Sequence, residues 1–194
     1  MAVWMVRAGR MGEEEALALE KGVTTIGWDE LPDLSLVDSK DAMRALIEEN
    51  NPDAPKGRIS NFTGQVWGFK GRIQEGDYVV MPLKARSAVA VGRVTGPYAY
   101  REDFPSDARH TRTVNWLRDD IPRTAFGQDL LQSLGAFLTV CSIKRNEAEE
   151  RIKAIVETGK DPHLHQKSAL PASSQSDEAD EEEAALDLEY YARD

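Results

Sequence analysis

The stretch Ile59–Tyr100, ISNFTGQVWGFKGRIQEGDYVVMPLKARSAVAVGRVTGPYAY, decides the fold expected for the chain. Its first part carries apolar residues at three- and four-residue steps: Ile59, Phe62, Val66, Phe69 and Ile73. This spacing places them on one face of a helix and predicts a core-facing helix over residues 58–74. A sharp turn is expected next, at Glu75-Gly76-Asp77.

A β-hairpin is predicted after that turn. Two runs rich in β-formers, Tyr78–Leu83 and Ala88–Val94, are joined by the short basic loop Lys84–Ser87. Gly96-Pro97 is expected to end the second strand and to deliver two tyrosines beyond it. A helix, a glycine turn, a hairpin and an aromatic exit together indicate a small barrel whose mouth could hold a flat ligand.

The rest of the chain adds strands and helices in a mixed order. Further strands are predicted at Ala2–Ala8, Val23–Trp28, His110–Leu117 and Leu138–Ile143. Further helices are predicted at Glu13–Lys21 (ended by Gly22), Lys40–Glu49 (capped by Ser39), Gly127–Leu134 and Glu147–Glu157 (capped by Asn146). About six strands without βαβ alternation predict an α+β fold, a twisted β-barrel flanked by helices.

The negative charge of the chain is concentrated at its end. The formal net charge is −10, but residues 171–194 hold nine of the 34 acidic residues and one of the 24 basic ones. Residues 1–170 therefore carry a net charge of only −2. We expect a folded domain over residues 1–158 and a flexible acidic linker over residues 159–194. A nearly neutral domain can bind nucleic acid only through a local basic patch and a pocket.

Several classes of protein are excluded or disfavoured by what the sequence lacks. No apolar run approaches the roughly 18 residues that span a bilayer, and the N-terminus lacks a signal-peptide pattern, so a cytoplasmic protein without membrane contact is expected. The single cysteine, Cys141, cannot form a disulfide within the chain. We find no P-loop, no metal-type cluster and no catalytic set, and expect neither a cofactor nor a metal nor an enzymatic activity.

The order of motifs resembles the N-terminal domain of Mrr-type restriction endonucleases, which is similar to EVE and YTH domains of the PUA-like superfamily. The matching segments are Met5–Gly9 (MVRAG), Val23–Trp28 (VTTIGW), Asn61–Trp67 (NFTGQVW), Gly76–Pro82 (GDYVVMP), Gly92–Tyr98 (GRVTGPY) and Asp120–Cys141. The resemblance implies a PUA-like domain that recognises a modified base in DNA for a modification-dependent endonuclease. The nuclease domain would follow as a C-terminal partner.

Aromatic and amide side chains form the predicted base pocket. A flipped base is held by stacking between aromatic rings and by hydrogen bonds to its Watson–Crick edge. Trp28 is expected in the cage, with Tyr98 or Tyr100 opposite and Asn61 at the edge; similar domains place an aromatic after the second strand. The full set of expected pocket residues is Trp28, Asn61, Gln65, Trp67, Tyr98, Tyr100 and Trp116. Contacts to the nucleic-acid backbone are expected from Arg7, Lys84, Arg86, Arg109 and Arg112.

Two alternatives to a DNA reader stay open at this stage. The same barrel and cage could bind modified RNA, in which case the 2′-hydroxyl would be preferred. The aromatics could instead belong to the core of a partner-docking or oligomerisation module, with the helix at Glu147–Glu157 at an interface. The identity of the base, its modification and the formation of a homodimer are not specified by the sequence.

Overall fold

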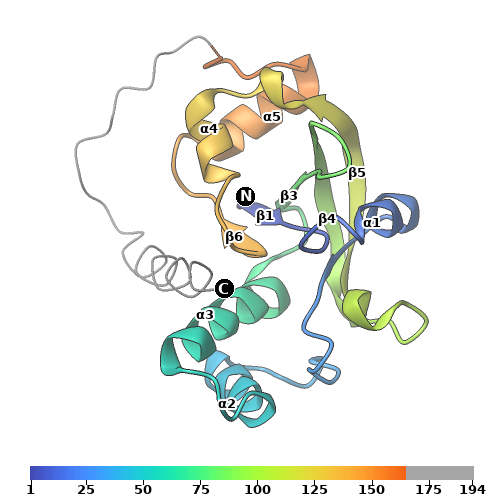
Figure 1. Cartoon of the computed structure of the whole chain (residues 1–194). Helices are drawn as coiled ribbons and strands as arrows, with labels where there is room; N and C mark the ends of the chain where they lie inside the picture. Colours follow the sequence, from blue (N-terminus) through green and yellow to red (C-terminus); the bar gives the residue numbers. More distant parts are fainter. Residues whose placement is uncertain (165–194) are drawn as a thin grey trace.

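One mixed β-sheet with helices packed on it organises the protein (Figure 1). The structure is a computed structural model and describes residues 1–164. Its strands are β1 (Val3–Val6), β2 (Val23–Ile26), β3 (Tyr78–Pro82), β4 (Ala88–Tyr100), β5 (His110–Pro122) and β6 (Val140–Ser142). Its α-helices are α1 (Glu15–Lys21), α2 (Lys40–Asn50), α3 (Lys56–Trp67), α4 (Gln128–Ser133) and α5 (Ala148–Thr158). The α+β class and the six strands are confirmed.

The sheet is open, and the predicted barrel is wrong. The strand order is β2-β5-β4-β3-β1-β6, with β1 parallel to β3 and every other neighbouring pair antiparallel. Within residues 1–164 the two edge strands, β2 and β6, do not pair with each other. They have four and three residues, so neither presents a ladder long enough to close the sheet.

Apolar side chains fill both faces of the central strands. Val3 and Met5 of β1 face a core with α4 and α5, whereas Trp4 and Val6 face a second core with α2 and α3. All residues of β1 and β3 are buried, which explains why these strands read as continuous apolar runs rather than alternating ones. Helices therefore cover the sheet from both sides.

The apolar stripe read from the sequence lies inside, as predicted for a core-facing helix. Ile59, Val66, Phe69 and Ile73 are all less than 5% exposed. The α-helix itself ends at Trp67 and continues as a π-helical turn over Gly68–Arg72. Side-chain packing accounts for two of its glycines, since Gly68 lies against the ring of Trp4 and Gly71 against the ring of Trp67.

The strand β4 runs on past Gly96-Pro97, where the sequence predicted its end. It pairs with β5 as far as Tyr100, which lies opposite His110. The register shifts between Val94 and Tyr98, because a proline has no N–H for the ladder. Gly96-Pro97 thus bends a long strand and re-aims Tyr98 instead of ending the strand.

Helix caps were predicted with mixed success. The hydroxyl of Ser39 accepts a hydrogen bond from the N–H of Ala42, and Gly22 ends α1 at a φ of 63°, as expected. Asn146 does not cap α5; its amide donates to the Asp129 carbonyl and to the Ser133 hydroxyl, which ties the start of α5 to α4. Its φ of 61° takes it out of the extended conformation that an N-cap adopts.

A buried ion-pair network closes the C-terminal side of the described chain. The guanidinium of Arg151 donates to both carboxylate oxygens of Asp161, at 2.9 and 2.6 Å, and to Asp129 at 2.6 Å. The side chains of Arg151 and Asp161 are 1% and 0% exposed. The packed unit therefore reaches at least Asp161, beyond the boundary expected at residue 158, and the rest of the predicted acidic linker, from residue 165 on, lies outside the described residues.

None of the helices in residues 1–164 combines the length and the apolarity needed to cross a bilayer.

Candidate functional site

A cavity of about 720 Å³ opens beside the end of β2, and we call it the Trp28 pocket. Five separate segments supply its walls, namely Arg7, Gly9, Arg10 and Met11 after β1, Gly27, Trp28 and Glu30 after β2, Arg58 and Phe62 on α3, Lys84 after β3, and Gly135, Phe137 and Thr139 before β6. Its volume lies in the range typical of small-ligand sites.

Trp28 holds an unusual backbone conformation at this site. Its φ is 63°, a left-handed value that is an outlier for a bulky side chain. The carbonyl of Trp28 accepts a hydrogen bond from the N–H of Leu31 at 2.9 Å, so a tight turn follows the strand. Such a residue costs about 1–3 kcal/mol, and strain of this kind concentrates at functional sites.

The ring of Trp28 is fixed by an aromatic neighbour on α3. The ring centroids of Trp28 and Phe62 are 5.5 Å apart and meet edge to face at 86°. The guanidinium of Arg58, one helical turn earlier, lies 5.0 Å from the centroid of the Phe62 ring. The pocket therefore combines two oriented aromatic rings with a cation over the Phe62 ring.

Basic side chains dominate the polar part of the wall. Arg7, Arg10, Arg58 and Lys84 line the pocket, against one acidic side chain, Glu30. The loop that carries Lys84 is held by the buried carboxylate of Glu15, which accepts hydrogen bonds from the backbone N–H groups of Lys84 and, at 3.2 Å, of Ala85. Lys84, predicted from the sequence to contact the nucleic-acid backbone, lines this cavity.

Arg7 lies in the pocket wall but is occupied with structural contacts. Its guanidinium donates to the carbonyls of Leu134, Ala136 and Leu138 at 3.2, 2.7 and 3.2 Å. Burial lowers the pKa of Arg7, and the neighbouring charge of Arg123 lowers it further. We therefore assign Arg7 to fixing the loop before β6, not to contacting a phosphate.

The two predicted amides lie behind the pocket. Asn61 accepts a hydrogen bond from Gln65 at 2.6 Å, and the Gln65 carbonyl oxygen accepts from the N–H groups of Thr139 and Val140 at 2.7 and 3.1 Å. Both are buried, and neither lines the cavity. Their hydrogen bonds join α3 to β6, so the structure places them as support for the wall.

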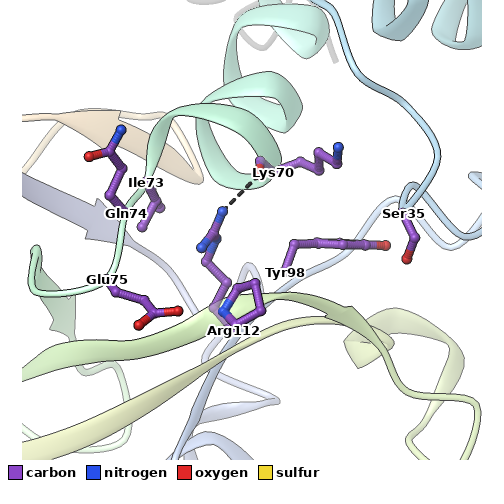
Figure 2. Close-up of a pocket in the computed structure, with 8 residues that line it drawn as sticks. Ser35, Lys70, Ile73, Gln74, Glu75, Tyr98 and Arg112 are labelled. Atoms are coloured by element: carbon purple, nitrogen blue, oxygen red, sulfur yellow. Dashed lines mark hydrogen bonds between the residues drawn. The ribbon is translucent and has the colours of Figure 1, made fainter.

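Tyr98 lies in a different cavity, of about 580 Å³, together with Lys70, Glu75 and Arg112 (Figure 2). Its hydroxyl accepts a hydrogen bond from the N–H of Leu34 at 3.2 Å. Burial raises the pKa of Tyr98, so the phenol stays protonated. The expected cage, with Trp28 and Tyr98 facing each other, is therefore divided between two cavities.

His110 connects these two cavities. Its Nδ1 lies 2.8 Å from the Tyr98 hydroxyl, and its Nε2 lies 3.3 Å from the carbonyl of Trp28. Burial lowers the pKa of His110, which favours the neutral ring. Because a carbonyl can only accept, Nε2 carries the proton and donates to Trp28, while Nδ1 accepts from Tyr98. Tyr100 also packs against the His110 ring, with the two rings tilted and their centroids 5.2 Å apart.

Arg112 is a structural group. It is 5% exposed and donates to the carbonyls of Phe69 and Lys70 at 2.7 Å each and of Gly96 at 3.3 Å. Figure 2 shows its guanidinium pointing at the end of the helical segment, where unpaired carbonyls need donors. Burial lowers its pKa. It caps the π-helical turn instead of facing a phosphate.

The remaining predicted residues are spread over the molecule. The indole N–H of Trp116 donates to the Ala18 carbonyl at 3.0 Å, and Trp67 packs against the core on the α2 and α3 side. Arg86 donates to the Asp119 carbonyl at 2.8 Å, and Arg109 to the Phe104 carbonyl at 3.4 Å. None of these four lines the Trp28 pocket.

Sequence reasoning missed two exposed apolar residues at the pocket, Met11 and Phe137. Met11 lies between Gly9 and Gly12, and Phe137 follows Gly135 by two residues. Neither belongs to a periodic pattern of apolar residues. A large apolar side chain in such a loop has no helix or strand face to explain it, and that was the available clue.

Comparison with known proteins identifies a family without a described activity. A family model described as a domain of unknown function, DUF8426, matches residues 4–132. A search of curated proteins found no match. Among solved structures, a structural-genomics target from Agrobacterium tumefaciens is similar at 12% identity, covering 84% of this chain and 99% of that one, with a TM-score of 0.40.

Proposed function

We propose that this chain, which belongs to the DUF8426 family, is a nucleic-acid-binding domain whose Trp28 pocket takes one unpaired base. The observation that carries the proposal is the joint placement of oriented aromatic rings and basic side chains around one cavity. A base offers a flat π-face to such rings, and its phosphates offer negative charge to the basic rim.

Stacking would supply the affinity for the base. Trp28 and Phe62 line the cavity with their rings at right angles, so a base can lie along one ring while it meets the edge of the other. Stacking of a base on an aromatic side chain is worth about 1–3 kcal/mol. Cavity volume and aromatic contact together fit a single base better than a duplex segment.

Electrostatics would supply the contact with the strand. Arg10, Arg58 and Lys84 stand at the cavity, whereas the net charge of residues 1–170 is only −2. Attraction for a phosphate backbone would therefore act at the pocket and not over the whole surface. Phosphate contacts position the strand and carry no sequence information by themselves.

The pocket also contains a group that can discriminate between bases. The carboxylate of Glu30 is an acceptor at a wall otherwise rich in donors. A carboxylate accepts from the exocyclic amino group of cytosine. Within this proposal the base carries such an amino group, and thymine or uracil is disfavoured because it lacks one.

The finer part of the proposal rests on the motif resemblance described above. We propose that the base is a methylated one in DNA, and that the domain serves a modification-dependent endonuclease of the Mrr type with a PUA-like ancestry. The apolar rings support this choice, because a methyl group gains free energy when it moves from water into contact with them. An RNA strand is the competing ligand.

Binding to matched oligonucleotides tests the function. Fluorescence anisotropy at about 50 mM salt would compare unmodified DNA, N6-methyladenine DNA, 5-methylcytosine DNA and methylated RNA. We expect Trp28→Ala to weaken the preferred ligand by about tenfold or more, since one stacking face is lost. Trp28→Phe keeps a ring and should retain most of the affinity.

The control is Leu36→Ala, since Leu36 is 95% exposed and lies outside the pocket. It should bind like the wild type. Thermal unfolding of each variant separates a lost contact from a lost fold. Equal weak binding of every oligonucleotide by the wild type and by a folded Trp28→Ala variant would refute the proposal.

A further inference from the structure

Two strongly exposed apolar side chains flank the Trp28 pocket. Phe137 is 75% exposed and Met11 is 72% exposed, and both line the cavity. Exposing this much apolar surface to water is unfavourable for a phenyl ring and a thioether chain. They lie at one cavity although their segments are far apart in sequence, and contact with a ligand would account for this placement.

The loop that presents Phe137 is firmly held. On its inner side Arg7 donates to the carbonyls of Leu134, Ala136 and Leu138, which stand on both sides of Phe137. The next residue after Leu138 is fixed as well, because the Thr139 N–H donates to Gln65 and the Thr139 carbonyl accepts from the Arg7 N–H at 2.9 Å. Leu134 and Leu138 themselves are buried.

The exposure of Phe137 is therefore imposed by its surroundings. With the backbone anchored before and after it, the side chain cannot turn into the core without breaking the contacts of Arg7. Because the backbone that carries the ring is already ordered, binding to the ring costs only the side-chain freedom of Phe137.

We propose that Phe137 is a stacking platform for the base next to the one in the Trp28 pocket, with Met11 at its edge. This inference rests on the function proposed above. When one base enters a pocket, its neighbour in the strand loses a stacking partner, and an exposed ring at the pocket rim can replace it. The ligand is then a strand of at least two linked nucleotides, and a free nucleotide is a poor one.

Competition binding against a labelled oligonucleotide tests the platform. The unlabelled competitors are mono-, di- and tetranucleotides of the preferred base, and the proteins are the wild type, Phe137→Ala, Phe137→Tyr and Leu36→Ala. We expect Phe137→Ala to weaken the di- and tetranucleotides by about tenfold and the mononucleotide distinctly less, since a mononucleotide has no second base to stack on Phe137. Phe137→Tyr should restore the affinity, and Leu36→Ala should have no effect.

The outcomes separate this inference from the proposed function. If the wild type binds the oligonucleotide and Phe137→Ala binds every competitor with the affinity of the wild type, the platform is refuted while the pocket stands. A mononucleotide that competes as well as a dinucleotide refutes it too. If no oligonucleotide binds the wild type, the proposed function fails and the platform fails with it. Because Phe137 is exposed, its variants are expected to keep the fold, which a thermal melt verifies.

Discussion

The protonation state of a single residue at the site is determined by its hydrogen-bond partners. His110 illustrates this, since a buried ring between the Tyr98 hydroxyl and the Trp28 carbonyl has to stay neutral to serve both. Protonation would place a donor opposite the Tyr98 hydroxyl and a charge in a buried site. Protonation would therefore disrupt the hydrogen bond from Tyr98 to Nδ1, while Nε2 would still donate to the Trp28 carbonyl, 82 positions away in the sequence.

We predict that this histidine makes the protein less stable in mild acid. Burial lowers the pKa of His110 below its ordinary value of 6.5, so the unfolded chain binds the proton more readily. Its contribution to stability is complete above about pH 6.5 and is lost as the pH falls toward the lower, folded-state pKa. Urea unfolding at about pH 7.5 and pH 5.5 measures the difference.

His110→Asn should reduce this pH dependence, and His163→Gln, at a half-buried position, serves as the matched control. A wild-type free energy of unfolding that is equal at the two pH values would contradict the role of His110. A loss of pH dependence in the control would assign the effect to His163 instead.

At the scale of elements, the sequence was most informative about local structure. Ser39 and Gly22 mark helix ends because each acts on backbone groups within a few residues. The stripe of α3 was readable because burial follows helix periodicity. Closure of the sheet was not readable, since it depends on which strands pair at the edges, a property set by long-range packing.

The candidate site was readable only in part, for the same reason. Of the residues predicted for the site, Trp28, Lys84 and Arg7 line one cavity. The partners expected for Trp28 were Tyr98 and Tyr100, but the bend at Gly96-Pro97 directs them elsewhere. Phe62 on α3 takes the place beside the Trp28 ring, and Phe137 before β6 lies at the rim of the same cavity; neither is near Trp28 in sequence.

The junction of α4, α5 and the segment that follows gives a prediction about stability. Arg151→Ala removes the guanidinium that pairs with Asp129 and Asp161, and it leaves the carboxylate of Asp161 buried without its cation. We expect a loss of about 3–5 kcal/mol in the free energy of unfolding. Denaturant titration measures it, with the exposed Arg44→Ala as the control.

The double variant Arg151→Met with Asp161→Asn should lose less stability than Arg151→Ala, because it leaves no unpaired buried charge.

Arg151 also lowers the pKa of Asp129 by hydrogen bonding. Burial opposes ionisation of Asp161, yet its hydrogen bonds from Arg151, Gly127 and His163 hold its pKa below the ordinary value. The stability from both carboxylates is present above about pH 4 and is lost below it. An acid midpoint unchanged by Arg151→Ala would argue against this network.

The whole molecule has a nearly neutral domain and an acidic C-terminal sequence, and both affect binding. About three phosphate contacts, one for each of Arg10, Arg58 and Lys84, would give a shallow salt dependence. We expect affinity to fall by roughly twentyfold to fortyfold between about 50 and 200 mM salt. A slope near zero would exclude phosphate contacts, and a much steeper one would require cations outside the pocket.

Removal of residues 171–194 is predicted to tighten binding at low salt. This segment carries nine acidic residues and one basic residue, which repel a polyanion. The gain should disappear at high salt, where such repulsion is screened. Anisotropy titrations of the full chain and of a chain ending at residue 170 provide the comparison, and equal affinity at low salt would contradict the prediction.

The hydrogen bonds of Arg7 to the loop before β6 also bear on the order in which the domain folds. The residue lies at the end of the first strand, yet its guanidinium closes on Leu134, 127 residues later. Contacts of such separation form slowly, because a long chain has to be ordered before they stabilise anything. During synthesis on the ribosome, β1 can pair with β3 early, whereas Arg7 meets this loop only after almost the entire domain has emerged. The wall of the pocket that precedes β6 is therefore completed last, and the pocket exists only once the fold is finished.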